Sequence, residues 1–288
     1  MDLYYDRNMT DKIIGPSIKS IEKYCIKNNY NINKIWDKLN KKSNINIHWG
    51  IKCIFKPNTF FRETLTNKYK YSIIIEQGFL NRKDYRSFGI NNYAGLSHII
   101  PNNCPNDRFN LLNINVKDMN INKKGYILFC GQLPWDTQVQ DINYNNYIND
   151  LFEKLKKITN RKIVFRYHPL YHTNNKKERF KIILPDYVIV DNNKNINDSF
   201  KESNVIISYN STSLVEAILE GRPIIALSKM SIVYDLSNKI ENINNIILPK
   251  KKIIMQKLYD ISYMQYNLKE LEDGTAFNYI KNIIKNNE

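Results

Sequence analysis

One stretch of the chain decides the fold: residues 205–227, VIISYNSTSLVEAILEGRPIIAL. Its first three residues form an apolar run of strand length, a polar turn follows, and apolar residues then recur at helical spacing from 214 to 219. Gly221 is placed to end this helix, and Pro223 begins a second apolar run. The stretch therefore predicts a strand, a turn, a helix and a second strand.

The turn of this unit, residues 209–212, is a candidate ligand site. Ser211 or Thr212 suits the N-cap position, and Glu216 suits the positive end of the helix dipole. Backbone N–H groups and hydroxyls at the carboxyl edge of a parallel sheet are where phosphate-bearing ligands dock. Any α/β protein contains such units, so the turn alone leaves a ligand role and a structural role open.

Two further loops leave strands of the C-terminal half in the same way, residues 131–138 and 166–171. Because the carboxyl ends of parallel strands meet at one edge, we expect all three loops to converge on one crevice that binds a diphosphate. Glu216 would accept from two ribose hydroxyls, although it could instead serve the helix dipole. The candidate donor-binding residues are Gly131, Gln132, Gln138, Arg166, His168, Ser211, Thr212, Ser213 and Glu216.

Several motifs of other enzyme classes are missing from the sequence. No GxGxxG follows a strand and no GxxxxGK[ST] occurs, which argues against dinucleotide oxidoreductases and P-loop NTPases. No GxSxG elbow occurs, so triad hydrolysis is not expected. The four cysteines are scattered without a CxxC pair, so we expect reduced, structural thiols and no zinc. No DxD-like pair follows a strand, and no metal is expected.

The N-terminal half contains the candidate general base. Glu76 follows the apolar run 71–75, at the end of a strand, where the pocket of a parallel sheet opens. A salt-bridged strand end is the alternative role for Glu76. Asp84 and Asp6 are weaker candidates for the base.

Residues 79–109 are rich in Gly, Asn, Pro, Arg and aromatic residues and lack clean periodicity. Long irregular stretches inside a compact domain are usually functional loops or disordered segments. Interleaved basic and aromatic side chains suit phosphate contacts and base stacking, and a basic solvated loop is the alternative. The candidate nucleic-acid contacts are Arg82, Tyr85, Arg86, Tyr93 and Arg108.

Composition and charge set the broad class. The 288 residues are 42% hydrophobic, enough for one large or two ordinary domains. Strands alternate with helices, which favours a Rossmann-like parallel sheet. The net charge of +15 attracts polyanions, nucleic acid ahead of an anionic membrane surface, although a codon bias toward lysine explains part of it. No apolar run approaches membrane-span length and no signal-peptide core occurs, so we expect a cytoplasmic protein.

Several segments resemble known glycosyltransferases. Three of them resemble the nucleotide-sugar-binding half of two-Rossmann (GT-B type) enzymes near the capsule and Kdo transferases: YILFCGQLPWDTQVQ (126–140), IVFRYHPL (163–170) and SYNSTSLVEAILEGRPIIAL (208–227). Three others are similar to phage-encoded glycosyltransferases associated with modified DNA bases: IIIEQGFLNRKDYRSFGINNYAGLS (73–97), PNDRF (105–109) and LYDISYMQYNLKELEDGTAF (258–277). The resemblance covers most of the chain from about residue 45 onward.

The resemblance implies an α/β fold with two Rossmann-like domains facing a central cleft. The expected division is an N-terminal acceptor domain at 1–118, a nucleotide-sugar-binding domain at 125–252, and a helical segment at 253–288 that crosses back to the first domain. His168 and the 211–213 turn would face the donor phosphates, Glu216 the ribose, and Glu76 would take the proton of the acceptor.

The implied reaction moves a sugar from a nucleoside diphosphate sugar, UDP-sugar favoured, to a hydroxyl acceptor without a further cofactor. The favoured acceptor is the hydroxymethyl group of a modified pyrimidine in duplex DNA, flipped out of the stack. One alternative is a capsule or envelope polysaccharide transferase whose charge serves membrane attachment. Another is a catalytically silent Rossmann-scaffold protein that binds nucleic acid. No obligate protein partner is implied.

Overall fold

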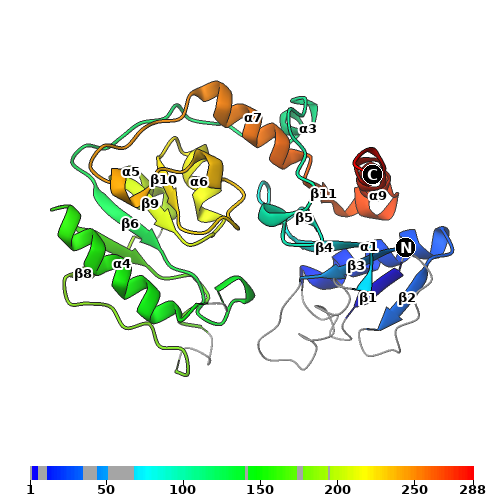
Figure 1. Cartoon of the computed structure of the whole chain (residues 1–288), viewed down its shortest axis with the longest axis horizontal. Helices are drawn as coiled ribbons and strands as arrows, with labels where there is room; N and C mark the ends of the chain where they lie inside the picture. The colour runs from blue at the N-terminus through cyan, green and yellow to red at the C-terminus, as the bar shows by residue number, and fades with distance from the viewer. Residues whose placement is uncertain are drawn as a thin grey trace. The chain divides into compact units, whose positions relative to one another are not determined.

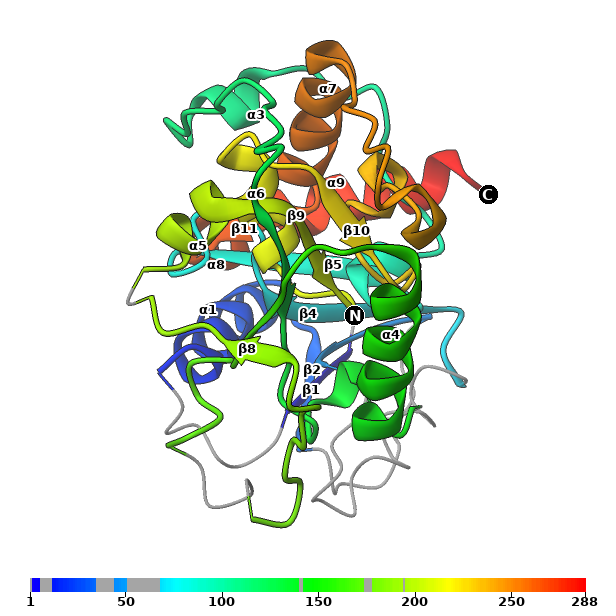
Figure 2. The ribbon, with the colours of Figure 1, turned by 90° about the vertical axis from the view of Figure 1, so that its left-hand side faces the viewer.

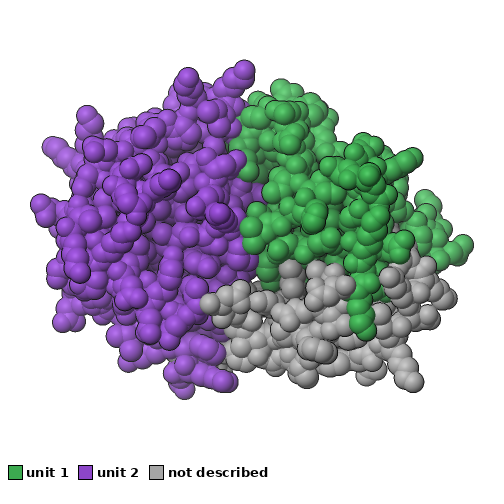
Figure 3. Space-filling model, in the orientation of Figure 1, with its two compact units in different colours: residues 1–113, 256–288 green, residues 114–255 purple. Residues whose placement is uncertain are grey.

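The protein forms two compact units in the computed structural model, which describes residues 2–5, 12–34, 44–50, 68–139, 142–173, 178–193 and 195–288. Unit 1 consists of residues 1–113 and 256–288, and unit 2 of residues 114–255 (Figure 3). Each unit has its own sheet and its own hydrophobic core (Figure 1). The chain therefore returns to unit 1 after it has completed unit 2.

Unit 2 is built on a parallel five-stranded sheet with the order β10-β9-β6-β7-β8. β9 and β10 lie side by side in the view of Figure 2. The central strands are buried along almost their whole length, as expected for a sheet covered on both faces. The strands are β6 (Tyr126–Cys130), β7 (Ile163–Arg166), β8 (Val188–Val190), β9 (Ser203–Ser208) and β10 (Ile224–Ala226).

Helices α4 (Tyr144–Ile158), α5 (Ile196–Glu202) and α6 (Ser213–Leu219) follow strands of this sheet. The side chain of Asn143 caps α4 by accepting from the backbone N–H of Asn146 at 3.3 Å. Apolar residues of α4 recur every three or four positions and face the core. The ring of Phe129 lies 5.3 Å from that of Phe152 on α4 and 5.6 Å from that of Phe165 on β7. These aromatic contacts fix the helix against the sheet.

Unit 1 contains a mixed six-stranded sheet with the order β11-β5-β4-β3-β1-β2. The four strands from β4 to β2 are parallel, whereas β5 and β11 are antiparallel to their neighbours. Helix α1 (Ile14–Lys27) contributes its apolar face to the core. The strands are β1 (Asp2–Tyr5), β2 (Asn31–Lys34), β3 (Ile45–Trp49), β4 (Tyr71–Gln77), β5 (Tyr85–Ile90) and β11 (Gln265–Asn267).

The C-terminal segment completes unit 1. It begins within α7 (Lys251–Ser262), whose residues from Gln256 onward belong to unit 1, and continues with β11, α8 (Leu268–Glu272) and α9 (Thr275–Asn286). β11 pairs with β5, and the ring of Phe277 on α9 stacks on that of Tyr24 at 4.6 Å. Asn267 and Glu270 form a capping box at the start of α8. The last part of the chain is therefore part of the first unit's core.

The structure differs from the sequence expectation over residues 79–109. This stretch holds the strand β5, the short helix α3 (Asp107–Asn110) and the 3₁₀ turn η1 (Ala94–Leu96). The alternation expected of a half-exposed strand is absent because β5 is buried from Arg86 to Ile90. The other 3₁₀ turns are η2 (Thr137–Val139), η4 (Tyr234–Leu236) and η5 (Ile240–Asn242).

Cys25, Cys104 and Cys130 are buried free thiols. Cys53 lies outside the described residues. Among the described helices, none combines the length and the apolar character that crossing a membrane requires.

Candidate functional site

The three polar loops of unit 2 leave neighbouring strands at one edge of its sheet. β9, β6 and β7 are adjacent and parallel, so Ser208, Cys130 and Arg166 end them on the same side. The Gly131 N–H donates to the Arg166 carbonyl at 2.9 Å, and the Ser208 hydroxyl donates to the Cys130 carbonyl at 2.7 Å. The loops therefore begin side by side, which is the geometry that the candidate site requires.

A pair of amide side chains ties the first loop to the third. Gln132 Nε2 donates to Asn210 Oδ1 at 2.6 Å, and the Asn210 N–H donates to Gln132 Oε1 at 3.0 Å. Asn210 Nδ2 also donates to the carbonyl of Gln138 at 3.4 Å. Both amide groups are buried. The side-chain amide of Gln132 therefore holds the loops in place, and the atoms that could contact a phosphate are already bonded to Asn210. Asn210 was not among the sequence candidates, although it lies within the turn that led to them.

The turn between β9 and α6 places the three hydroxyl residues differently. Ser211 Oγ accepts from the Ser213 N–H at 3.2 Å, while Ser211 and Thr212 are half-buried. Ser213 is buried beside the Cys130 thiol. Burial raises the pKa of Cys130 to about 12, and the Ser213 hydroxyl acts in the opposite direction. Ser211 and Thr212 are thus the hydroxyl residues with solvent-facing surface, and Glu216 is half-buried on α6.

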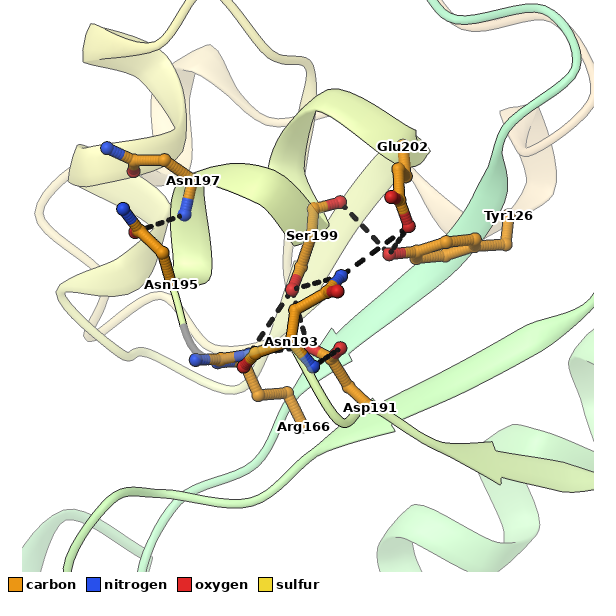
Figure 4. Close-up of polar contacts among 8 residues, drawn as sticks. All are labelled: Tyr126, Arg166, Asp191, Asn193, Asn195, Asn197, Ser199 and Glu202. Carbon is orange, nitrogen blue, oxygen red and sulfur yellow. Dashed lines mark hydrogen bonds and ion pairs between the residues drawn. The ribbon is translucent and has the colours of Figure 1, made fainter.

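Arg166 is held in an internal network with α5 (Figure 4). Its Nη1 donates to Asp191 Oδ2 at 2.7 Å and to the Asn193 carbonyl at 2.9 Å. The Ser199 hydroxyl donates to the same Asp191 oxygen at 2.5 Å. The Asp191 side chain is only 3% exposed. The guanidinium charge is therefore compensated by a buried carboxylate, which sequence reasoning missed although Asp191 directly follows β8.

The ring of His168 is oriented by the turn that follows β7. Its Nδ1 accepts from the Leu170 N–H at 3.1 Å, and its carbonyl accepts from the Tyr171 N–H at 2.8 Å. Because Nδ1 acts as an acceptor, the proton of the neutral ring lies on Nε2. His168 is half-buried, so the ring can present a donor to an anion at this edge.

The two described acid candidates of unit 1 both belong to the β4–β5 hairpin. Glu76 is half-buried and pairs with Ser87 across the antiparallel ladder. Asp84 is exposed in the connecting turn, where its N–H donates to the Asn81 carbonyl at 2.9 Å. β4 has a parallel neighbour on one side only, which differs from the expected end of a wholly parallel strand. Asp6 lies outside the described residues.

Arg86, expected on a nucleic-acid-binding loop, is instead an internal residue at 2% exposure. Its Nε donates to the Ser17 hydroxyl of α1 at 2.6 Å, and its Nη1 donates to the Tyr85 carbonyl at 2.8 Å. Tyr93 is also buried, at 6% exposure. The expectation that these two side chains form an exposed stacking surface is wrong, because both are buried: Arg86 on β5 and Tyr93 just before the turn η1.

Arg108 joins α3 to the C-terminal segment. Its Nη1 lies 2.7 Å from Glu270 Oε1, and its guanidinium carbon lies 4.2 Å from the ring centre of Tyr266. Burial lowers the pKa of Arg108, but the Glu270 carboxylate outweighs burial and raises it overall. Arg108 is therefore not an exposed nucleic-acid contact. Arg82 and Tyr85 are half-buried, and their role in acceptor binding stays a prediction.

Solved structures share this architecture. The Thermosulfurimonas dismutans KpsC beta Kdo 2,4 transferase aligns with a TM-score of 0.54 at 11% identity, over 93% of this chain and 92% of that chain. The beta Kdo 2,7 transferase of the same KpsC aligns with a TM-score of 0.51 at 15% identity, over 98% of this chain and 99% of that chain. No curated protein matches the sequence. The chain therefore has a fold of the GT-B type, with two α/β units that each contain a Rossmann-like sheet.

A family model described as the LIC12162 family transferase matches residues 83–238. The match runs from the turn of the β4–β5 hairpin through all five strands of unit 2. It includes the three loops and covers more than half of the 288 residues. The chain therefore belongs to the LIC12162 family of transferases.

Proposed function

We propose that this transferase is a glycosyltransferase that moves a sugar from a nucleotide sugar to a hydroxyl acceptor. The observation that carries the proposal is the set of three polar loops at one edge of the unit 2 sheet, tied by the Gln132–Asn210 bridge. Family membership supports a transferase activity, and the structural likeness to the Kdo transferases supports a sugar as the group that is transferred. A parallel sheet of this kind binds its ligands outside the carboxyl ends of its strands.

The donor would bind through its phosphate groups at this edge. Phosphate oxygens would accept from the backbone N–H groups and hydroxyls of Ser211 and Thr212, and from His168 Nε2. These donors would stabilise the negative charge that develops on the leaving phosphate. Glu216 would accept from the ribose hydroxyls. Arg166 contributes less to phosphate binding in this proposal, because Asp191 already compensates its charge.

The transfer itself would break the bond between the anomeric carbon and the phosphate oxygen and form a bond to the acceptor oxygen. The acceptor hydroxyl must lose its proton in this step, and a carboxylate can accept it. Glu76 is the proposed base, because it is a half-buried carboxylate near the end of β4. Asp84 is the second candidate, although its exposure leaves it solvated.

Two acceptor classes belong to the proposal. The likeness to the KpsC transferases favours a capsule or envelope saccharide. The net charge of +15 favours a polyanion such as hydroxymethylated DNA. The internal positions of Arg86, Tyr93 and Arg108 weaken the case for a DNA acceptor, because three of the five expected DNA-contacting side chains are directed into unit 1.

A donor and acceptor screen tests the proposal. The purified chain would be incubated with UDP-, CMP- and GDP-sugars, and with capsule-type oligosaccharides or hydroxymethylated duplex DNA. Mass spectrometry would detect the added sugar, and the acceptor that gains it decides between the two classes. The absence of both transfer and nucleotide-sugar hydrolysis with every donor would overturn the proposal. DNA binding without nucleotide binding would instead favour the silent scaffold protein.

A further inference from the structure

Unit 2 has a second polar site at the opposite edge of its sheet. A pocket of about 910 Å³ lies where β6 and β7 begin and where α4 ends. The donor loops leave the carboxyl ends of the same parallel strands, so the two sites are separated by the length of the strands. The pocket is lined by Lys124, Gly125, Tyr126, Lys157, Ile158, Thr159, Asn160, Arg161, Lys162 and Asn244.

Four of the ten lining residues are cationic, and none is acidic. Arg161, Lys124, Lys157 and Lys162 form no ion pair with another described residue, in contrast to the paired Lys154 nearby on α4. Among the described residues, Glu202 contacts the lining with its carboxylate, which accepts from the Tyr126 hydroxyl at 3.3 Å (Figure 4). Four positive charges in one pocket repel each other and attract an anion of several charges.

The guanidinium of Arg161 is fixed in place rather than mobile. Its Nη1 donates to the carbonyls of Lys123 and Gly125 at 2.8 and 2.9 Å. Carbonyl oxygens orient the group but leave its charge uncompensated. Asn244 Nδ2 donates to the Ile158 carbonyl at 2.7 Å and so covers one of the carbonyls at the end of α4, which would otherwise repel an anion. The Arg161 guanidinium and the Asn244 amide are thus oriented by hydrogen bonds within the pocket wall.

We propose that this pocket binds a ligand with several phosphate groups, as a site distinct from the donor edge and independent of the proposed function. Its volume is in the range of ligand pockets, and its donors suit phosphate oxygens. Such phosphate groups come from soluble compounds or from the headgroups of a membrane surface. The two sources share their chemistry, and the experiment below separates them.

The decisive variant removes two pocket charges that have no structural role. Lys124→Ala/Lys162→Ala changes exposed side chains outside helices and strands, so the fold should be retained. Lys181→Ala/Lys239→Ala is the matched control, because both lysines are exposed in unit 2 outside the pocket and the charge change is equal. Calorimetric titration with inorganic tripolyphosphate should show roughly tenfold weaker binding for the pocket variant only. Equal affinities of the two double variants overturn the proposal.

Vesicle sedimentation identifies the source of the phosphate. The same proteins would be sedimented with vesicles of phosphatidylcholine containing phosphatidylglycerol. If the pocket variant alone detaches, the headgroups are the ligand. If the two variants sediment alike while tripolyphosphate binding still differs, the ligand is a soluble phosphate compound. Added salt should lower the affinity of the wild-type protein more steeply than that of the pocket variant, because fewer positive charges of the variant contact the phosphate groups.

Discussion

The two units use their arginines in different ways. In unit 2, Arg166 stands at the end of a parallel strand and pairs with Asp191 beside the candidate donor edge. In unit 1, Arg86 and Arg108 turn into the unit, where they hold α1 and the C-terminal segment. A basic residue in a loop-like stretch therefore does not by itself indicate a ligand, because burial or an internal carboxylate can hold it within the fold. The half-buried residues His168 and Glu76 are better candidates for function than the arginines.

The largest expected effect separates the roles of the two units. Glu76→Ala in unit 1 should lower kcat by about 10²- to 10⁴-fold with nearly unchanged donor affinity, because a general base acts only in the transition state. His168→Ala in unit 2 should raise the KM for the donor and lower kcat less than Glu76→Ala does, because it removes a contact to the bound and leaving phosphate. Steady-state kinetics at varied donor concentration measures both constants. Glu76→Gln is the control, since it keeps the shape of the side chain and removes its basicity.

Equal losses of stability in the two variants would assign both residues to structural roles. Thermal unfolding of the same preparations checks this. A normal kcat for Glu76→Gln would show that Glu76 is not the general base and that Asp84 or another group accepts the proton.

The second prediction concerns the buried ion pair of unit 2. Arg166→Ala should lower the free energy of unfolding by about 3–5 kcal/mol, because it leaves the Asp191 carboxylate buried without its cation. Urea denaturation measures the change. Lys154→Ala is the matched control: it breaks the exposed pair with Glu241 in the same unit and should change stability little. If Arg166→Ala leaves stability unchanged but abolishes donor binding, Arg166 binds the donor and its role is not mainly structural.

The third prediction concerns the connection between α3 and the C-terminal segment. Arg108→Ala removes the ion pair with Glu270 and the contact with Tyr266. We expect a loss of about 2–3 kcal/mol, smaller than for Arg166 because Glu270 is 20% exposed and can be hydrated. Lys23→Ala, which breaks the exposed pair with Glu272, serves as the control. A drop in DNA affinity without a drop in stability would contradict the structural role of Arg108.

The fourth prediction tests whether the loops of unit 2 must be tied together. Gln132→Ala leaves the buried amide of Asn210 without its reciprocal partner, so the third loop should shift. Donor affinity should fall by about tenfold, measured by titration with a nucleoside diphosphate. Asn210→Ala should have a similar effect, and the double variant should be little worse than either single one. Additive losses would mean that the two amides act separately.

The sequence predicted unit 2 more completely than unit 1 for a physical reason. Its parallel strands are continuous apolar runs followed by polar loops, so strand ends and loop positions can be located from the pattern. In unit 1, β5 has the sequence YRSFGI, whose buried Arg86 and Gly89 hide the strand. The pairing of β11 with β5 joins residues about 180 positions apart, which no local pattern indicates. Asp191 and Asn210 were missed because their partners become neighbours only in the folded sheet.

The smallest expected effect compares one thiol from each unit. Burial raises the pKa of Cys130 to about 12, while burial and the charge of Asp260 raise the pKa of Cys104 to about 12. Both groups are thiols at neutral pH, so iodoacetamide should label neither residue in the folded protein, whereas both should react after urea unfolding. Peptide mapping by mass spectrometry reports each residue separately.

The same two thiols contribute to the pH dependence of stability at alkaline pH. A thiol whose pKa is higher in the folded state than in the unfolded state contributes stability that is complete below the unfolded pKa. This contribution should fall as the pH rises from about 9 toward 12, because the unfolded chain ionises first. Asp260→Asn should reduce the loss of stability that comes from Cys104 in unit 1, because the charge of Asp260 helps to raise the pKa of that thiol. It should not change the contribution of Cys130, whose pKa is raised mainly by burial. Fast labelling of Cys130 at neutral pH would show that the carboxyl edge of unit 2 opens to solvent. The hydrogen bonds between the loops at this edge would then be present only in the closed conformation.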